Sequence, residues 1–229
     1  VIDAAKAPTC TETGLTEGKH CSVCNEVIVA QTVVDALNHD FTEQNTDSKY
    51  LESEATCTEK AKYYYSCSRC DEKGTETFEY GDVLVTNVTI NNTPYNTLEA
   101  AVEAAEAGTT IELVNSLDLV TAIEINKDLT INLKGNTLTV ENDTEGNGVF
   151  HVTSGATLTI EGEGTINGAG NNKWNIAVFV EGENSKAIIN NGKFTNKDVD
   201  PSKWEDNTHF DLIYVKDGAT VEINGGTFE

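Results

Sequence analysis

The six cysteines are the residues of this chain whose types and spacing most directly suggest chemistry. They lie before residue 71 in two groups of three: Cys10, Cys21 and Cys24, then Cys57, Cys67 and Cys70. Both leading cysteines stand in a Thr-Cys-Thr-Glu context, so the groups form an internal duplication with a period of about 47 residues. A Cys-x-x-Cys pair presents two thiolates from one tight turn, which is half of the tetrahedral ligand set of zinc.

We predict one structural zinc site in each of these two modules. The predicted ligands of the first module are Cys10, Cys21, Cys24 and His39, with His20 as a weaker substitute for His39. The predicted ligands of the second module are Cys57, Cys67 and Cys70, and the matching stretch, residues 81–87, contains no histidine. Disulfides and free thiols stay open as alternatives, although three cysteines per repeat cannot all pair within one unit. A unit of about 40 residues needs a metal or a cross-link because it buries little apolar surface.

The first module also resembles a known kind of repeat. The segments 1–5, 10–14 and 17–24 are similar to short repeats of large surface proteins from Gram-positive anaerobic bacteria. The resemblance covers residues 1–86 and implies an extracellular protein in which the repeats stand between adhesive or sugar-active domains. A Gly-His pair usually closes that repeat, whereas this chain has Asn38-His39 in the first copy and Val85-Thr86 in the second.

Two tryptophans lie in segments that interrupt a repeating β pattern further along the chain. The interruptions are residues 141–148, 167–175 and 195–211, and the chain's only tryptophans, Trp174 and Trp204, fall in the second and third. Flat indole faces stack on sugar rings, so we predict a glycan-binding surface there, for host or dietary glycans. Packing of both indoles over the flank of the fold is the alternative.

The third interruption also carries a cluster of carboxylates. Its aspartates are Asp198, Asp200, Asp206 and Asp211. Paired carboxylates hydrolyse glycosidic bonds or hold calcium, which makes calcium a second candidate cofactor. Polysaccharide lyases with a β-helix fold usually draw charge neutralisation from arginine or lysine; the sole arginine, Arg69, lies in the cysteine region, and Lys173, Lys197 and Lys203 are the lysines near these segments. We therefore predict no catalysis, with a polysaccharide lyase or glycoside hydrolase using these aspartates as the alternative.

One helix and many short strands are predicted to position these loops. Residues 96–108 have apolar side chains at helical spacing, with Asn96 as N-cap, Glu99 completing a capping box and Gly108 ending the helix. After residue 108 the apolar period becomes two. A short helix of this type suits a cap over the first coil of a solenoid.

The strands recur every 28 to 35 residues, and residues 149–160 match residues 212–223 at every apolar position. This period is too long for hairpins and fits three short strands per coil, which predicts an all-β, right-handed parallel β-helix. A β-sandwich is the alternative fold. Residues 95–102, 108–113 and 129–135 resemble the start of pectate-lyase-like β-helix domains. The pattern still runs at Glu229, so we expect the domain to be truncated there.

The predicted organisation is cysteine module 1 at residues 1–43, cysteine module 2 at 44–86 and the β-helix at 87–229. The formal net charge of −23 disfavours nucleic acid and anionic membranes as partners. The sequence contains no run of 18 apolar residues, so it predicts no membrane-spanning helix. We expect a secreted or surface-displayed adhesin-like segment, with the enzyme above and a passive structural stalk as alternatives.

Overall fold

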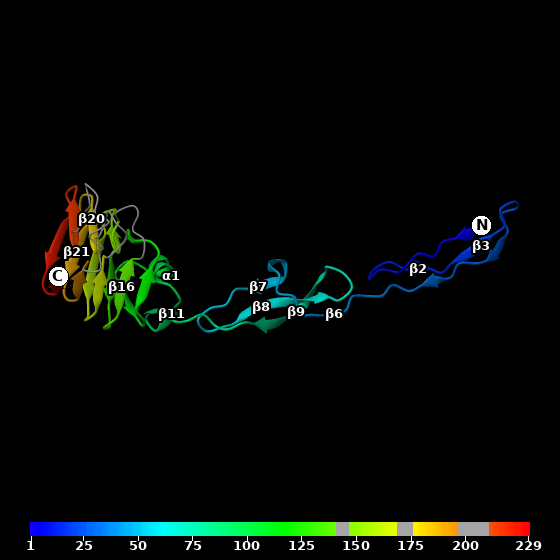
Figure 1. Cartoon of the computed structure of the whole chain (residues 1–229), viewed down its shortest axis with the longest axis horizontal. Helices are drawn as coiled ribbons and strands as arrows, with labels where there is room; N and C mark the ends of the chain where they lie inside the picture. Colours follow the sequence, from blue (N-terminus) through cyan, green and yellow to red (C-terminus); the bar gives the residue numbers. More distant parts are fainter. Residues whose placement is uncertain (141–146, 169–175, 197–210) are drawn as a thin grey trace, which may run out of the picture. The chain divides into compact units, whose positions relative to one another are not determined.

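The computed structural model describes residues 1–140, 147–168, 176–196 and 211–229 (Figure 1). The chain divides into two compact units, Val1–Val83 and Leu84–Glu229. The predicted loop residues Trp174, Trp204, Asp198, Asp200 and Asp206 lie outside the described residues, and Asp211 is described and exposed. Within the described ranges, no helix is long and apolar enough to cross a bilayer.

The first half of unit 1 consists of very short antiparallel strands. They are β1 (Ile2–Asp3), β2 (Gly14–Leu15), β3 (Gly18–His20), β4 (Val27–Val29) and β5 (Val33–Val34). One sheet has the order β1-β3-β4, and β2 pairs with β5. The turn between β3 and β4 holds Cys21 and Cys24, and the amide of Cys21 closes it by donating to the Glu26 carbonyl at 2.9 Å.

The second half of unit 1 is built on a longer hairpin. Its elements are β6 (Phe41–Glu43), the 3-10 helix η1 (Ser48–Tyr50), β7 (Leu51–Ser53), β8 (Ala61–Cys67) and β9 (Lys73–Tyr80). Strand β8 pairs with β9 on one edge and with β6 and β7 on the other. The buried apolar side chains of unit 1 are Cys10, Tyr50, Cys67 and Phe78. Two of the four are cysteines, so this unit has almost no hydrocarbon core.

Unit 2 begins with an antiparallel hairpin and one short helix. Strand β10 (Val88–Ile90) pairs with β11 (Thr93–Tyr95) and also with β12 (Thr109–Leu113), in both cases antiparallel. Helix α1 spans Leu98–Ala104 and buries Leu98, Ala101 and Val102. The helix packs on β10, β11 and β14.

The predicted helix was right in position but wrong in its bounds, 96–108, and in its cap. Thr97, with an extended backbone, is the N-cap, and its hydroxyl accepts from the Ala100 amide at 3.1 Å. The Asn96 side chain instead donates from Nδ2 to the Val85 carbonyl at 2.8 Å. The helix ends before Ala105, whose backbone is again extended, and Gly108 lies instead in the turn into β12, at φ +83°.

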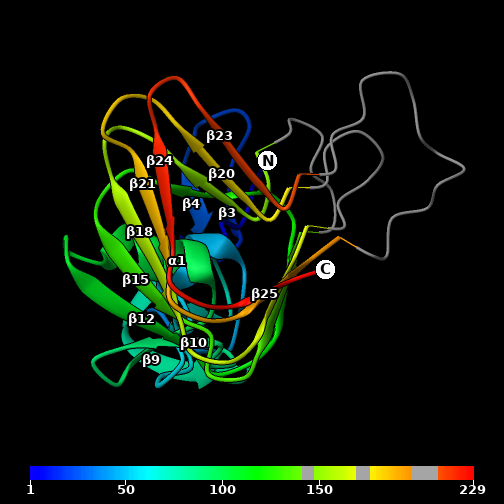
Figure 2. The same ribbon diagram turned by 90° about the vertical axis from the view of Figure 1, so that its left-hand side faces the viewer.

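Three sheets of parallel strands make up the rest of unit 2 (Figure 2). The first contains β12, β15 (Leu129–Asn132), β18 (Thr157–Glu161), β21 (Lys186–Ile189) and β24 (Thr220–Ile223). The second contains β13 (Leu117–Leu119), β16 (Thr137–Val140), β19 (Thr165–Asn167), β22 (Lys193–Thr195) and β25 (Thr227–Phe228). The third contains β14 (Ile123–Ile125), β17 (Phe150–Val152), β20 (Val178–Glu181) and β23 (Ile213–Lys216).

Successive strands of the chain belong to the first, second and third sheet in turn, and equivalent side chains of neighbouring strands are paired in register. Val152 pairs with Val180, and Val180 with Val215, so the aliphatic positions align from strand to strand. In the first sheet Ile111, Ile131, Ile160 and Ile189 align in the same way and are completely buried. The predicted mostly-β class with parallel strands is confirmed, and the antiparallel hairpins of a β-sandwich are not what joins these strands.

Candidate metal centre

Four side chains of unit 1 converge on one point. Their ligand atoms all lie within 4.8 Å of one another, and the residues are Cys10, His39, Cys67 and Cys70. Cys10 and His39 come from the first predicted module, whereas Cys67 and Cys70 come from the second. The structure therefore differs from the predicted partition of one site per module, because the site lies at the junction of the two.

Antiparallel pairing explains why Cys10 does not join Cys21 and Cys24. Ile2 pairs with Lys19, and Lys6 forms a bridge with Leu15, so Cys10 lies in the turn that closes this ladder. Cys21 follows the other end of the ladder, six residues after Leu15. Six extended residues span about 20 Å, which is far beyond the size of one coordination shell.

The geometry of the four side chains fits a tetrahedral ion. The Sγ atoms of Cys10 and Cys67 are 3.8 Å apart. Two sulfurs bound to one zinc at about 2.3 Å each would be about 3.8 Å apart in a tetrahedron, whereas a disulfide requires about 2.05 Å. The Sγ of Cys70 lies 3.3 Å from Nδ1 of His39, so Nδ1 is the ring nitrogen that faces this sulfur.

Local hydrogen bonds position each ligand. The turn that holds Cys10 is closed by the Thr9 hydroxyl, which accepts from the Glu12 amide at 2.9 Å. The Cys67 amide donates to the Glu72 carbonyl at 2.9 Å, which folds the turn between β8 and β9. His39 follows Asn38, whose φ is +57°, and its ring stacks on Phe41 at 5.2 Å.

A second layer of contacts fastens the histidine segment to the Cys67–Cys70 turn. Arg69 donates from one guanidinium nitrogen to the carbonyls of Leu37 and Asn38, both at 3.1 Å. Asp40 accepts from the Ser68 hydroxyl at 3.0 Å. Contacts of this kind orient metal ligands. This role of Arg69, the only arginine of the chain, is not predicted from the sequence.

The pKa values of the two buried thiols, Cys10 and Cys67, are shifted in opposite directions. Burial raises the pKa of Cys10 to about 11, and hydrogen bonds with Cys70 and Cys67 add to the effect. Burial also acts to raise the pKa of Cys67, but the amides of Asp40 and Arg69, with His39, lower it to about 6. The surroundings therefore favour the thiolate form of Cys67 and the protonated form of Cys10.

The remaining predicted ligands lie elsewhere in unit 1. Cys21 is half-buried and Cys24 exposed, in the turn between β3 and β4. His20 is paired through Nδ1 with Asp3 at 2.8 Å. Cys57 lies in a turn closed by Thr56 and Glu59, as Cys10 lies in one closed by Thr9 and Glu12. Among the described residues, none of these cysteines joins a group of three potential metal ligands.

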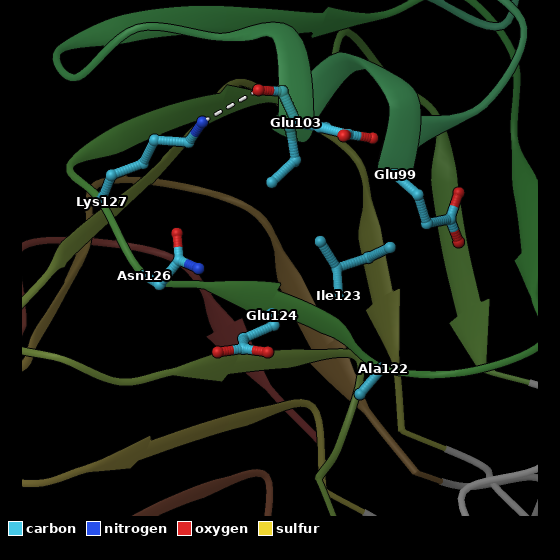
Figure 3. A pocket seen from close by; sticks show the side chains of 8 residues that line it. Glu99, Glu103, Ala122, Ile123, Glu124, Asn126 and Lys127 are labelled. Carbon is cyan, nitrogen blue, oxygen red and sulfur yellow. Dashed lines mark hydrogen bonds between the residues drawn. The ribbon is translucent and has the colours of Figure 1, made fainter.

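Unit 2 has a cavity of about 350 Å³ beside helix α1 (Figure 3). Carboxylates of Glu99, Glu103 and Glu124 surround an apolar floor that includes Ile123. Lys127 donates to the carbonyls of Glu103 at 3.1 Å and Ala105 at 2.7 Å. It thereby satisfies acceptors at the end of α1, which is a structural role.

The third parallel sheet carries a row of aromatic rings that sequence analysis did not single out. His151, Phe179 and Tyr214 occupy one register position, with ring centroids 4.7 and 5.3 Å apart. Glu181 accepts from Lys216 at 2.8 Å and lies 2.9 Å from His151. The contact with Lys216, and to a smaller extent that with His151, lowers the pKa of Glu181. The rings face one another and Phe179 is only 6% exposed, so the row stabilises the sheet.

Comparisons of this chain with protein-family models, with curated proteins and with solved structures gave no match.

Proposed function

We propose that Cys10, His39, Cys67 and Cys70 bind one structural Zn²⁺ that joins the two cysteine repeats. The observation that carries the proposal is the approach of three sulfurs and one imidazole nitrogen to within 4.8 Å of one another. Three thiolates and one imidazole are a frequent ligand set of structural zinc, and soft sulfur ligands disfavour calcium and magnesium. Four protein ligands close the coordination shell and leave no position for a substrate, which favours a structural role over a catalytic one.

The poverty of the core of unit 1 supports the same role. Apart from the two ligand cysteines, only Tyr50 and Phe78 are buried apolar side chains in residues 1–83. A chain of this size cannot fold on two buried rings, and metal binding then supplies folding free energy.

Metal analysis of single variants tests the proposed ligand set. We expect one zinc per chain, which Cys67→Ser abolishes and the matched control Cys24→Ser leaves in place. Cobalt substitution should give the absorption of a tetrahedral ion with three thiolates. Loss of zinc in Cys24→Ser together with its retention in Cys67→Ser would instead support one site per module and refute the proposal.

For the whole chain we propose a non-catalytic segment of a secreted, adhesin-like surface protein of a Gram-positive anaerobe. In this proposal, unit 2 is a right-handed parallel β-helix and the zinc-bound repeats are its spacer. Three in-register parallel sheets and a net charge of −23 support the proposal, since a strongly charged surface suits a hydrated extracellular protein.

We propose glycans as its ligands, through Trp174 and Trp204. Retention on a glycan array that is lost in Trp174→Ala and Trp204→Ala is the expected result. No retention by the native chain would favour a passive stalk. New reducing ends or unsaturated uronates from pectins would refute the non-catalytic reading and support the lyase or hydrolase that uses the aspartates of residues 198–211, with calcium as its candidate cofactor.

A further inference from the structure

The turn that holds Cys21 and Cys24 repeats the local structure of the turn that holds Cys67 and Cys70. Each lies at the tip of an antiparallel hairpin, between β3 and β4 in one case and between β8 and β9 in the other. In each, the amide of the first cysteine donates 2.9 Å to the carbonyl of the residue five positions later. The amides of Cys24 and Val23 lower the pKa of Cys21, as the Arg69 amide helps to do for Cys67.

The Cys67–Cys70 turn receives three things from the preceding repeat. These are the thiol of Cys10, the imidazole of His39 and strand β6, which pairs with β8 at Cys67. The segment between His39 and β6 also contributes the amide of Asp40, which lies 3.4 Å from Sγ of Cys67. At this turn, the preceding repeat therefore supplies two of the four potential ligands and an edge strand.

The Cys21–Cys24 turn presents the same pair of thiols at the tip of a hairpin. In the part of the chain that the structure describes, no third thiol or imidazole joins this pair in a group of potential metal ligands, and no further edge strand lies beside it. Strand β3 pairs only with β1 and β4, and neither pairing reaches Cys21. Val23, which occupies the position of Arg69, is 93% exposed. Four further exposed apolar side chains belong to the flanking strands: Ile2, Val27, Ile28 and Val29. These apolar side chains belong to the sheet whose β3–β4 turn carries the two thiols, and exposed apolar side chains on one small sheet favour a surface that another protein segment covers.

We propose that Cys21 and Cys24 are the receiving half of a second zinc site, which the cysteine turn and histidine of another repeat of the same kind complete. The partner is therefore a Thr-Cys-Thr-Glu turn together with a histidine about 29 residues later, the half that Cys10 and His39 form here. The inference rests on the proposed function of the first site. Binding exchanges the thiol protons for one Zn²⁺ and releases them to solvent, so no oxidant takes part.

A tandem chain tests the inference. Residues 1–47 are duplicated ahead of the full chain, so that Cys10 of the added copy precedes Cys21 of the original by one residue more than the 57 that separate Cys10 from Cys67. We expect two zinc ions per tandem chain, against one in the native chain. Cys21→Ser with Cys24→Ser in the original copy should return the content to one, as should Cys10→Ser with His39→Ala in the added copy.

Three outcomes keep the two proposals apart. A native chain without zinc refutes the proposed function and this inference together. One zinc in the native chain and one in the tandem chain refutes this inference alone. If the tandem chain misfolds and holds no zinc, a second experiment tests the inference. The native chain is mixed with a Cys67→Ser, Cys70→Ser variant, whose Cys10 and His39 have no Cys-x-x-Cys turn of their own chain to complete. A zinc-dependent 1:1 complex that Cys21→Ser with Cys24→Ser in the native chain abolishes supports the inference, and its absence overturns it.

Discussion

Removal of zinc should unfold unit 1 and leave unit 2 folded. The two buried rings of unit 1, Tyr50 and Phe78, contribute about 1.5–3 kcal/mol each by burial. A structural zinc contributes about 10–16 kcal/mol, and a whole domain is typically stable by only about 5–15 kcal/mol. Loss of the ion therefore exceeds what the small core can offset. Unit 2 has no such dependence, because its interior is a continuous cluster of buried aliphatic side chains.

Hydrogen exchange read by mass spectrometry resolves the two units. In chelator-treated protein, or in Cys67→Ser, we expect the amides of β8 and β9 to lose their protection while those of β18 and β21 keep it. Cys24→Ser should exchange like the native protein in both units. Protected β8 and β9 amides in protein shown to be free of metal would refute the reasoning, because unit 1 would then be stable on contacts that its burial does not reveal.

Three further predictions follow from individual side chains. The pKa of Cys10 is raised to about 11 and that of Cys67 is lowered to about 6, so zinc binding at neutral pH must displace the Cys10 proton. The apparent zinc affinity, measured by chelator competition, should therefore rise with pH. Below about pH 6, where Cys67 also takes up a proton, the affinity should fall more steeply as the pH is lowered. Arg69→Ala should weaken zinc binding about 10–100-fold by releasing the histidine segment, and Arg69→Lys should not restore it, since lysine lacks the planar guanidinium. Ile160→Ala in the buried stack should destabilise unit 2 by about 2–5 kcal/mol in denaturant melts, whereas Thr159→Ala on the other face of β18 should change it by less than about 0.5 kcal/mol.

Sequence patterns predicted the strands of unit 2 well because strands that pair in register within parallel sheets repeat the same apolar pattern. The period of two assigns alternate residues to the interior, and the match of residues 149–160 with 212–223 predicted that Val152 and Val215 would align through Val180. The helix was located by its apolar spacing. Its cap is Thr97 and not the predicted Asn96, whose side chain donates to the Val85 carbonyl in a contact that links residues 11 positions apart and has no local signature.

The sequence by itself determined which side chains could hold a metal, that they belong to a duplicated unit, and that the second part of the chain would pair its strands in parallel. Only the tertiary structure decided which cysteines meet. The spacing of Cys10 fits a Cys-x-x-Cys turn 11 residues ahead as well as one 57 residues ahead. The antiparallel ladder through Ile2–Lys19 and Lys6–Leu15 holds the nearer turn about 20 Å away, so the ligand set is shared between neighbouring repeats.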